Sequence, residues 1–384
     1  MSLLGPPARG AICLLVVSSS IVVLSTAGGL GSDATSRSAA AYLSVDDDYG
    51  EEDESGDSSF SFPDPETSSA STGLVFGFYD DKCPDAEEMV SSMVRKLYHA
   101  DPNVAAALVR LFFHDCFIHG CDASVLLDRV GGQRSERDAG PNQSLRGLGA
   151  VEAIKRGVEK ACPGTVSCAD ILALAARDSL VLVGGPTYPV LTGRRDSAQS
   201  FYYDADGGGI PPPNATYAMT LDAFARRGQF TERETVALLG AHSIGKVRCR
   251  FIADRIYNFA GTGAPDDSID PDMVGEMRAA CGGGDGAAPM EMGYYRQGRE
   301  VGFGAHYYAE LLEGRGILRA DQQLTAGSTV RWVRVYASGA RGEELFRDDF
   351  AHAMVKLSAL APLTGSAGQD LGLEFEGKGG LMPF

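Results

Sequence analysis

Basic clusters are missing from this sequence, in which 34 Lys and Arg stand against 51 Asp and Glu over 384 residues. Nucleic-acid binding needs a concentrated positive surface, so we expect no nucleic-acid partner. Strand-like alternation of apolar and polar residues is scarce, and no internal repeat is evident. These absences argue against an all-β domain and against a repeat protein, and they leave a mainly helical chain.

The sequence also lacks an uninterrupted apolar run of the roughly 20 residues that a membrane-spanning helix needs. The run Ala11–Leu24 is short and contains three serines, with Arg9 before it and the small residues 25–27 after it. This pattern is typical of an export signal, so we expect residues 1–27 to be a signal peptide that is removed. An uncleaved membrane anchor is the alternative, and the short run argues against it.

A second segment, residues 28–73, has little apolar density and is rich in Ser, Asp and Glu. It holds eleven acidic residues and one Arg, so about −10 of the net charge of −17 lies here. Such a composition cannot bury enough apolar surface to offset chain entropy, and we expect it to be disordered. The acidity therefore says little about the folded part.

Eight cysteines occur, and Cys13 lies in the signal, so seven remain after export. An exported protein is expected to form disulfides. Seven is an odd number, so the cysteines cannot all pair within one chain.

Helical spacing of apolar residues dominates from Leu74 onward. A helix is expected around residues 89–97, with Asp85 and Glu88 resembling a capping box, and another over 104–113. Ser167 is expected to begin a helix that stops at Gly184, and Thr231 with Glu234 forms a second capping signature. A late helix is expected over 346–360.

The segment 110–124 carries the most chemistry. Arg110 and His114 are four residues apart, so on a helix both project from one face and could act on one small ligand. The alternative is an Arg and a His on a solvated helix face. The apolar residues 111–113 weaken that alternative, because a charged Arg in such surroundings needs a partner or a purpose.

Metal-ligand types also gather in this segment. His114, Cys116, His119 and Cys121 could bind zinc, although their spacing is tighter than usual and the two cysteines could instead close a small disulfide. A separate set of oxygen donors suits calcium. It comprises the side chains of Asp115, Asp122 and Ser124 and the carbonyls of Ile118 and Gly120.

His242 is expected to end a capped apolar helix that includes residues 236–241. A lone histidine at such a place is usually a satisfied core residue. What favours a functional role is the resemblance of the whole chain to a known family.

The chain resembles the secretory plant haem peroxidases, class III. The motifs run in family order over residues 74–365. They are Phe78-Tyr79, Cys83-Pro84-Asp85-Ala86-Glu87, the block 110–124, Ser144-Leu145-Arg146-Gly147, Ala161-Cys162-Pro163, Ser167-Cys168-Ala169-Asp170, Gly193-Arg194-Arg195-Asp196-Ser197, Gly240-Ala241-His242 and Ala320-Asp321-Gln322.

The resemblance implies an all-α, two-lobed haem peroxidase fold, with haem b between a distal helix and a proximal helix. His242 would be the proximal ligand of the haem iron, and Asp321 would accept the other N–H of its ring. On the distal face His114 would act as base and then as acid, and Arg110 would stabilise charge, beside Phe113. Asn142, backed by Glu136, would accept the N–H of the distal imidazole.

The implied reaction reduces hydrogen peroxide and oxidises small phenolic donors by one-electron steps through an oxoferryl intermediate. The carbonyl of Pro211 would receive the donor. We expect a secreted monomer, extracellular, in the cell wall or in the vacuole, with no membrane partner.

The family pairing implies the disulfides Cys83–Cys162, Cys116–Cys121 and Cys249–Cys281. Cys168 usually pairs with a late cysteine, and none follows Cys281. We therefore expect Cys168 to stay outside the intramolecular disulfides. The tail 366–384 is also unlike the family's ending.

Further departures concern calcium and the aromatic core. The resemblance implies a distal calcium on the oxygen set described above and a proximal one near Ser243. The segment 303–308 lacks an aspartate that the family places there, so the proximal site is expected to lack a ligand. Tyr188 replaces the family's Trp.

The alternative function is a catalytically weakened secreted protein that binds haem or calcium and has a damaged C-terminus.

Two sequons begin at Asn142 and Asn214. An Asn142 that serves the distal network should be buried, which makes Asn214 the better glycosylation candidate.

Overall fold

The computed structural model describes residues 72–129, 132–282, 289–293 and 302–370. All of them belong to one compact unit that spans residues 58–384. The expected signal peptide, nearly all of the expected acidic segment and the chain beyond residue 370 lie outside the described residues. No described helix is long and apolar enough to cross a membrane.

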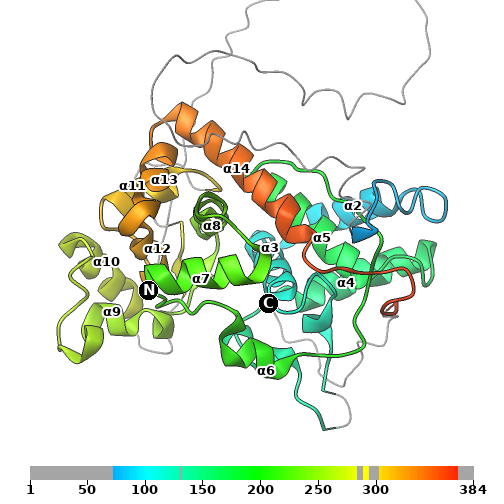
Figure 1. The fold of residues 1–384 in the computed structure, drawn as a ribbon, viewed down its shortest axis with the longest axis horizontal. Helices are drawn as coiled ribbons and strands as arrows, with labels where there is room; N and C mark the ends of the chain where they lie inside the picture. The colour runs from blue at the N-terminus through cyan, green and yellow to red at the C-terminus, as the bar shows by residue number, and fades with distance from the viewer. Residues whose placement is uncertain (1–71, 130–131, 283–288, 294–301, 371–384) are drawn as a thin grey trace, which may run out of the picture. The chain divides into compact units, whose positions relative to one another are not determined.

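The described chain is all-α, as expected (Figure 1). Its helices are α2 (Ala86–Ala100), α3 (Asn103–Cys116), α4 (Leu148–Ala161), α5 (Cys168–Leu182), α6 (Tyr202–Asp204), α7 (Tyr217–Gly228), α8 (Glu232–Leu239), α9 (Ala253–Tyr257), α10 (Pro271–Cys281), α11 (His306–Leu312), α12 (Arg319–Gln322), α13 (Val330–Tyr336) and α14 (Ala340–Ser358).

Shorter turns of helix connect these elements. The ones used below are η2 (Ser124–Leu126), η3 (Glu136–Asp138), η4 (Gly140–Asn142) and η6 (Gly240–Ser243). The described strands have two residues each and form two antiparallel pairs. These are β1 (Arg194–Arg195) with β4 (Leu363–Thr364), and β2 (Lys246–Val247) with β3 (Met290–Glu291).

Local sequence explains where several helices begin. The side chain of Ser167 accepts a hydrogen bond from Asp170 N and starts α5. Thr231 and Glu234 form the expected capping box of α8. The expected box at Asp85 is wrong: this residue precedes α2 but its side chain makes no capping hydrogen bond.

Two further boundaries differ from expectation. The late helix begins at Ala340 and ends at Ser358, six residues earlier at its start than the apolar spacing indicated. Arg341, Glu343 and Glu344 lie in the added turns, because helix propensity does not need apolar side chains. His242 does not end α8 but lies in the tighter turn η6 that follows it.

The main core is one large apolar cluster. Helix α5 packs against α3 and α2, and α14 packs against α8 (Figure 1). Twelve residues of α5 are buried, which is consistent with its central place in this cluster. A smaller apolar cluster is formed by α9, α10, β2 and β3 with Ile317 and Leu318.

A buried ion pair holds the centre of the main core. Arg194 Nη1 lies 2.7 Å from Asp170 Oδ1, and both side chains are fully buried. Arg194 also donates to Ser358 O at 2.6 Å, and Tyr79 donates to Asp170 at 2.6 Å. The pair therefore joins α5, β1, the end of α14 and the start of the described chain. Removing one partner of such a pair would leave an uncompensated buried charge.

Three disulfides join the same cysteines as the family pairing. They are Cys83–Cys162, Cys116–Cys121 and Cys249–Cys281. Cys168 is buried and forms no disulfide with a described cysteine. Near Cys168, residues 363–370 return to β1 by non-covalent contacts: Asp196 pairs with Gln369 and Arg195 lies 2.8 Å from Asp370.

Candidate active site

Helix α3 carries Arg110 and His114 one turn apart. His114 is buried, with 5% of its surface exposed, whereas Arg110 is exposed between Val109 and Leu111, which are buried. The spacing of four places both side chains on one face of the helix, as expected.

One short segment after η3 binds both of these side chains. Arg110 Nη2 donates to Pro141 O and to Ser144 Oγ, each at 3.1 Å. His114 Nδ1 lies 2.7 Å from Asn142 Oδ1. Residues 141–144 therefore fix the guanidinium and the imidazole relative to each other.

The orientation of Asn142 sets the tautomer of His114. Asn142 Nδ2 donates to the backbone carbonyl of Glu136 at 2.9 Å, which leaves Asn142 Oδ1 as the acceptor. His114 Nδ1 must then carry the proton, and Nε2 is left with its lone pair. Asn142 itself is buried, with 3% exposed.

Glu136 contacts Asn142 through its backbone rather than its carboxylate. The side chain of Glu136 is fully buried and accepts from Phe201 N at 2.9 Å. Burial raises the pKa of Glu136 to about 7. The carboxylate thus belongs to the acidic loop described below, and only the carbonyl backs the distal histidine.

Electrostatics keep His114 neutral. Burial and, next, the positive charge of Arg110 lower its pKa to about 3, against the opposing effect of the hydrogen bond to Asn142. Burial lowers the pKa of Arg110 to about 10, so the guanidinium stays charged at neutral pH. A neutral base and a cation thus lie on the same helix face.

The second histidine, His242, is held by a carboxylate from α12. His242 Nδ1 lies 2.8 Å from Asp321 Oδ1, which brings together η6 and α12. Burial lowers the pKa of His242, but the charge of Asp321 and its hydrogen bond outweigh burial, and the net shift is upward. Asp321 is 1% exposed.

The side chains of His242 and Arg110 are closely surrounded by protein atoms and yet partly exposed to solvent. The side chain of His242 is 39% exposed, although protein atoms surround it closely enough for burial to be the largest single influence on its pKa. Arg110 shows the same combination. A side chain that is enclosed and yet reached by solvent borders an internal space. The charges of Arg110 and His242 also influence the pKa of His114. The arrangement fits a flat cofactor with an imidazole on each side.

Two further expected site residues are Phe113 on α3 and Pro211 in the loop before α7. Phe113 is half-buried and stacks on Phe117 with ring centroids 4.6 Å apart. Pro211 is half-buried in the loop before α7. Two residues later, Pro213 O accepts from Ala320 N at 3.0 Å, which ties this loop to the neighbour of Asp321.

An acidic loop follows α3. Asp115 and Asp122 are buried, and Ser124 Oγ is buried with no hydrogen-bond partner among the described residues. Burial raises the pKa of Asp115 well above its ordinary value, and the nearby Asp122 raises it further. Ala123 has a left-handed backbone, with φ of 60°. Buried like charges beside an unpartnered hydroxyl are unfavourable without a cation.

Of the two carbonyl donors expected at this loop, Gly120 lies beside the residues that follow α14. Gly120 has φ of 129°, and a Cβ there would lie 2.4 Å from Ala361 O, so only glycine fits. Cys121 N donates to Leu360 O at 3.1 Å. Ile118 is buried. This part of the loop therefore rests on Leu360 and Ala361, just after α14.

The geometry does not support the zinc alternative. In the described ranges no group of three or more His, Cys, Asp or Glu residues could hold a metal ion. The Cys116–Cys121 disulfide removes both sulfurs of the zinc alternative, and His119 is exposed and stacked on Phe201. An oxygen site built partly from carbonyl and hydroxyl groups does not depend on such a group of side chains.

Ser243 is buried, and Gly304 N donates to its Oγ at 3.4 Å. This contact places Ser243 beside the segment 303–308, which lacks the family's aspartate. Ala305 N instead donates to Glu343 Oε2 at 2.6 Å. The residues near Ser243 therefore fit a proximal calcium poorly.

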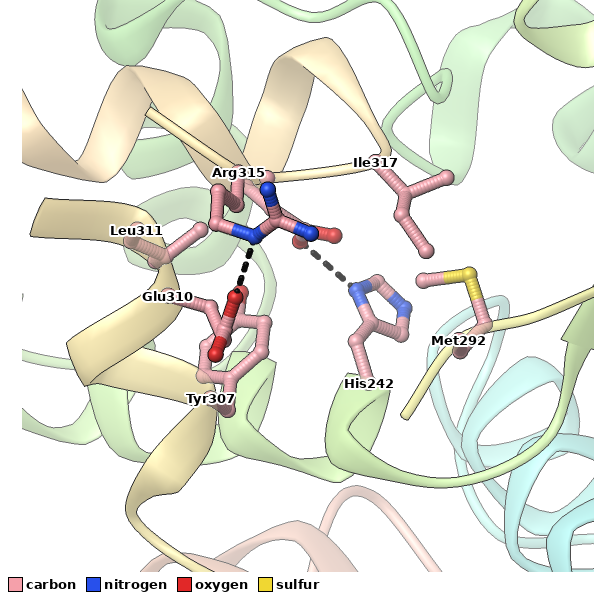
Figure 2. Close-up of a pocket in the computed structure, with 9 residues that line it drawn as sticks. His242, Met292, Tyr307, Glu310, Leu311, Arg315 and Ile317 are labelled. Carbon is pink, nitrogen blue, oxygen red and sulfur yellow. Dashed lines mark hydrogen bonds and ion pairs between the residues drawn. The ribbon is translucent and has the colours of Figure 1, made fainter. Parts of the chain in front are cut away.

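A pocket lies on the His242 side of the site (Figure 2). His242 and Asp321 line it together with α11 and the loop that leads to α12. Its other lining residues are Met292, Tyr307, Glu310, Leu311, Arg315, Gly316 and Ile317. Burial raises the pKa of Tyr307 well above its ordinary value, and Asp321 adds to the shift.

Sequence reasoning did not identify several residues that position this site. Ser144 and Pro141 bind Arg110, and Glu310 with Arg315 forms a buried ion pair beside the pocket. The motif Ser144-Leu145-Arg146-Gly147 was a usable signal for the first group. Nothing in the sequence spacing indicated the second.

Two imidazoles, each hydrogen-bonded through Nδ1, lie near enough for His242 to influence the pKa of His114. Imidazoles oriented in this way are typical of haem-dependent oxidoreductases. The peroxidase family model matches residues 90–339. Peroxidase 28 from Arabidopsis thaliana is 43% identical over 297 residues, which cover 77% of this chain and 90% of that protein. Peroxidase C2 from Armoracia rusticana is 39% identical over 297 residues, covering 76% of this chain and 84% of that protein.

The chain belongs to the peroxidase family, in its secretory plant branch, class III. It is an enzyme that reduces hydrogen peroxide at the expense of a donor, and the expected fold class and reaction class are confirmed. Membership implies haem and calcium in general terms.

Proposed function

We propose that haem b lies between His114 and His242 and that the enzyme oxidises small phenolic donors by one-electron steps. The observation that carries this proposal is the pair of hydrogen bonds that orient the two imidazoles, one to Asn142 and one to Asp321. Bound haem would supply a centre that accepts two oxidising equivalents from peroxide and passes them on singly.

His242 would hold the iron through Nε2, since Nδ1 faces Asp321 at 2.8 Å. When Asp321 accepts the hydrogen bond from Nδ1–H, the imidazole becomes a stronger electron donor. Asp321 is 1% exposed, so its charge acts with little screening by water. Support thus comes from the distance and the burial together.

His114 would take a proton from the peroxide oxygen nearer the iron and return it to the outer oxygen, which leaves as water. Its lowered pKa, about 3, keeps Nε2 able to accept that proton at neutral pH. Arg110, fixed by Pro141 and Ser144, would stabilise the negative charge that develops as the O–O bond breaks. Phe113 would exclude water beside them.

The donor would approach near Pro211, whose carbonyl is a hydrogen-bond acceptor for a phenol. Support comes from its half-buried position in a loop tied by Pro213 to Ala320. Asn214 is exposed in the same loop, whereas Asn142 is buried. We propose Asn214 as the glycosylated sequon, on an extracellular or cell-wall protein, with the vacuole as the alternative.

One calcium would bind the acidic loop through Asp115, Asp122, Ser124 and the carbonyls of Ile118 and Gly120. The buried like charges and the unpartnered Ser124 Oγ support this assignment. The carboxylate of Glu136 adds a further negative charge nearby. No calcium is proposed at Ser243.

The domain limits of residues 74–365 and a monomeric state remain part of this proposal. A damaged C-terminus is not favoured, because residues 363–370 pair with β1. The pairing of β4 with β1 and the ion pair of Arg195 with Asp370 hold this part of the chain in place without the family's late disulfide.

The visible spectrum of the purified protein tests the function. We expect a Soret band that shifts on adding one equivalent of hydrogen peroxide and returns after two equivalents of a phenol such as guaiacol. A protein that binds haem stoichiometrically but shows no change with peroxide would contradict the proposal.

A further inference from the structure

A row of three tyrosines leads away from the pocket behind His242. Tyr307 on α11 lines that pocket together with His242 (Figure 2). The ring centroid of Tyr307 lies 4.9 Å from that of Tyr308, which lies 4.9 Å from that of Tyr336 on α13. These distances are typical of aromatic rings that pack directly on one another. Helix α11 packs against α13, so the row passes from one helix to the next (Figure 1).

The three tyrosines are buried, and a phenylalanine packs beside the last two of them. The ring centroid of Phe346 lies 5.0 Å from that of Tyr308 and 5.7 Å from that of Tyr336. A phenol gives up an electron more readily than a phenylalanine ring does, so the tyrosines are the oxidisable groups here. A tyrosine side chain is also a phenol, the class of donor in the proposed reaction.

Tyr336 ends this row beside a proton acceptor. Its hydroxyl donates to Asp349 Oδ2 on α14 at 2.5 Å. Burial raises the pKa of Tyr336 above its ordinary range, and the charge of Asp349 raises it further, so the phenol keeps its proton until it is oxidised. A phenol that has lost an electron is a strong acid, and Asp349 can take its proton. Tyr308 donates instead to the backbone carbonyl of Val236, and the Tyr307 hydroxyl has no hydrogen-bond partner among the described residues.

The chain's single tryptophan lies next to this row but is a poor end point for oxidation. The ring centroid of Trp332, which is half-buried on α13, lies 6.5 Å from that of Tyr336. The guanidinium carbons of Arg233 and Arg331 lie 4.9 and 5.0 Å from the centre of the indole ring. Both cations oppose positive charge on the indole, and its buried Nε1 has no described acceptor for a proton. These contacts favour Tyr336 over Trp332.

We propose that Tyr336 is a redox-active tyrosine that stores one of the two oxidising equivalents that hydrogen peroxide brings to the site. An electron leaves Tyr336 and passes through Tyr308 and Tyr307 to the oxidised site, while the phenolic proton moves to Asp349. A neutral phenoxyl radical remains on Tyr336. An electron from a phenolic donor, passed along the row in the reverse order, later restores the hydroxyl as Asp349 returns the proton. The inference rests on the proposed function, since the peroxide reaction supplies the oxidant.

Electron paramagnetic resonance of the haem-loaded protein tests this role. The protein is mixed with one equivalent of hydrogen peroxide without a donor and frozen, beside a sample that carries ring-deuterated tyrosine. We expect a radical signal whose hyperfine structure changes with the label and which disappears on adding guaiacol. Tyr336→Phe should lose this signal. Asp349 keeps its contact with Arg233 Nε at 2.8 Å in that variant, so no lone buried charge is created.

Tyr202→Phe is the matched control. The Tyr202 hydroxyl also donates to a carboxylate, Asp206, at 2.7 Å, but its ring packs on Tyr203 and joins no described row that reaches the pocket. This variant and Trp332→Phe should keep the signal. Tyr308→Phe interrupts the row before Tyr336 and should lose the signal, so the result does not depend on the folding of one variant.

An unchanged signal in haem-loaded Y336F or Y308F would overturn the role of Tyr336, and loss of the signal in W332F or Y202F would do the same. A haem-loaded protein that reacts with peroxide but forms no tyrosyl radical would also overturn it, and would leave the proposed function standing. Failure of the unsubstituted protein to bind haem or to react with peroxide would instead contradict the proposed function. Haem content and the visible spectrum are recorded first, so the two failures are distinguished.

Discussion

His242 Nδ1 and Asp321 Oδ1 lie 2.8 Å apart, although 79 positions separate the two residues in the chain. The contact joins the turn after α8 to the short helix α12. The histidine that we propose as the iron ligand is thus oriented by a carboxylate from a distant part of the sequence, and metal-binding imidazoles typically have such a partner.

Replacing His242 with Ala should weaken haem binding by more than the roughly 10–100-fold typical of outer-shell changes at metal sites. The iron would lose its protein ligand, and the five-coordinate spectrum would disappear. Haem content after gel filtration and the visible spectrum measure this. His99→Ala, on the exposed end of α2, is the control. Unchanged haem content and spectrum in the His242 variant would disprove the assignment.

Replacing His114 with Ala should slow the reaction with peroxide by about 10²–10⁴-fold while haem stays bound, because the base is removed. Stopped-flow absorbance measures the rate. His119→Ala is the matched control, since His119 is exposed just beyond the same helix. Near-normal rates in the His114 variant would remove this residue from the mechanism.

The pH dependence follows from the same histidine. Its pKa is lowered to about 3, so the neutral form that accepts the proton persists down to acidic pH. The rate with peroxide should stay flat from pH 8 to about pH 5 and fall as the pH approaches the lowered pKa. A rate that halves near pH 6.5, the ordinary value for histidine, would contradict the structure.

Calcium removal should destabilise the protein more at pH 7.5 than at pH 5. Burial raises the pKa of Asp115 well above its ordinary value and that of Glu136 to about 7. Without calcium, the folded state binds more protons than the unfolded state at any pH between the ordinary pKa of these carboxyl groups and their raised pKa. The free energy of unfolding therefore falls as the pH rises through this window. Bound calcium keeps the carboxylates ionised and removes this loss.

The melting temperature with and without a chelator, at both pH values, measures the calcium effect. Asp122→Asn should abolish the dependence on chelator, whereas Asp204→Asn, on the exposed surface, should preserve it. Equal melting temperatures with and without chelator at pH 7.5 would mean that the loop holds no calcium.

Cys168 should remain a thiol that reagents modify only after unfolding. It is buried, and burial raises its pKa above the ordinary range, so little thiolate forms. Peptide mapping under non-reducing conditions measures its state, with Cys83 and Cys162 as bridged references. A disulfide from Cys168 to any cysteine of the same chain would refute this expectation.

The missing late disulfide should lower thermal stability relative to family members that have it. Closing a loop of about 200 residues contributes on the order of 4–5 kcal/mol in the chain-entropy model, which is an upper figure. The pairing of Asp196 with Gln369 and the ion pair of Arg195 with Asp370 offset part of the loss. Denaturant unfolding of this protein and of a four-disulfide relative compares them. Equal free energies of unfolding would contradict the expected deficit.

Local rules predicted the elements whose signals lie within a few residues. The box of Thr231 and Glu234 is confirmed because both partners lie in one turn. The same pattern at Asp85 failed because its backbone, with φ of −91° and ψ of 9°, is not in the extended conformation that capping residues usually adopt. A sequence pattern does not report that dihedral angle.

The spacing of residues in the sequence could not predict contacts between segments that are far apart in the chain. Arg315 meets Glu276 across 39 positions, and Arg110 meets Ser144 across 34. The sequence named Glu136 as the residue behind Asn142, but only the fold shows that its backbone carbonyl makes the contact. The resemblance named the residues of the site, but it did not name the groups that hold them.

The hydrogen bond from Ala320 N to Pro213 O has a consequence for how this enzyme can diversify. It links the rim where a phenol would arrive to the residue beside the proximal carboxylate. A loop remodelled to admit a new substrate would pull on the segment that orients His242. With the donor and iron sites as proposed, a change in substrate range at this loop would also act on the oxidising strength of the iron site.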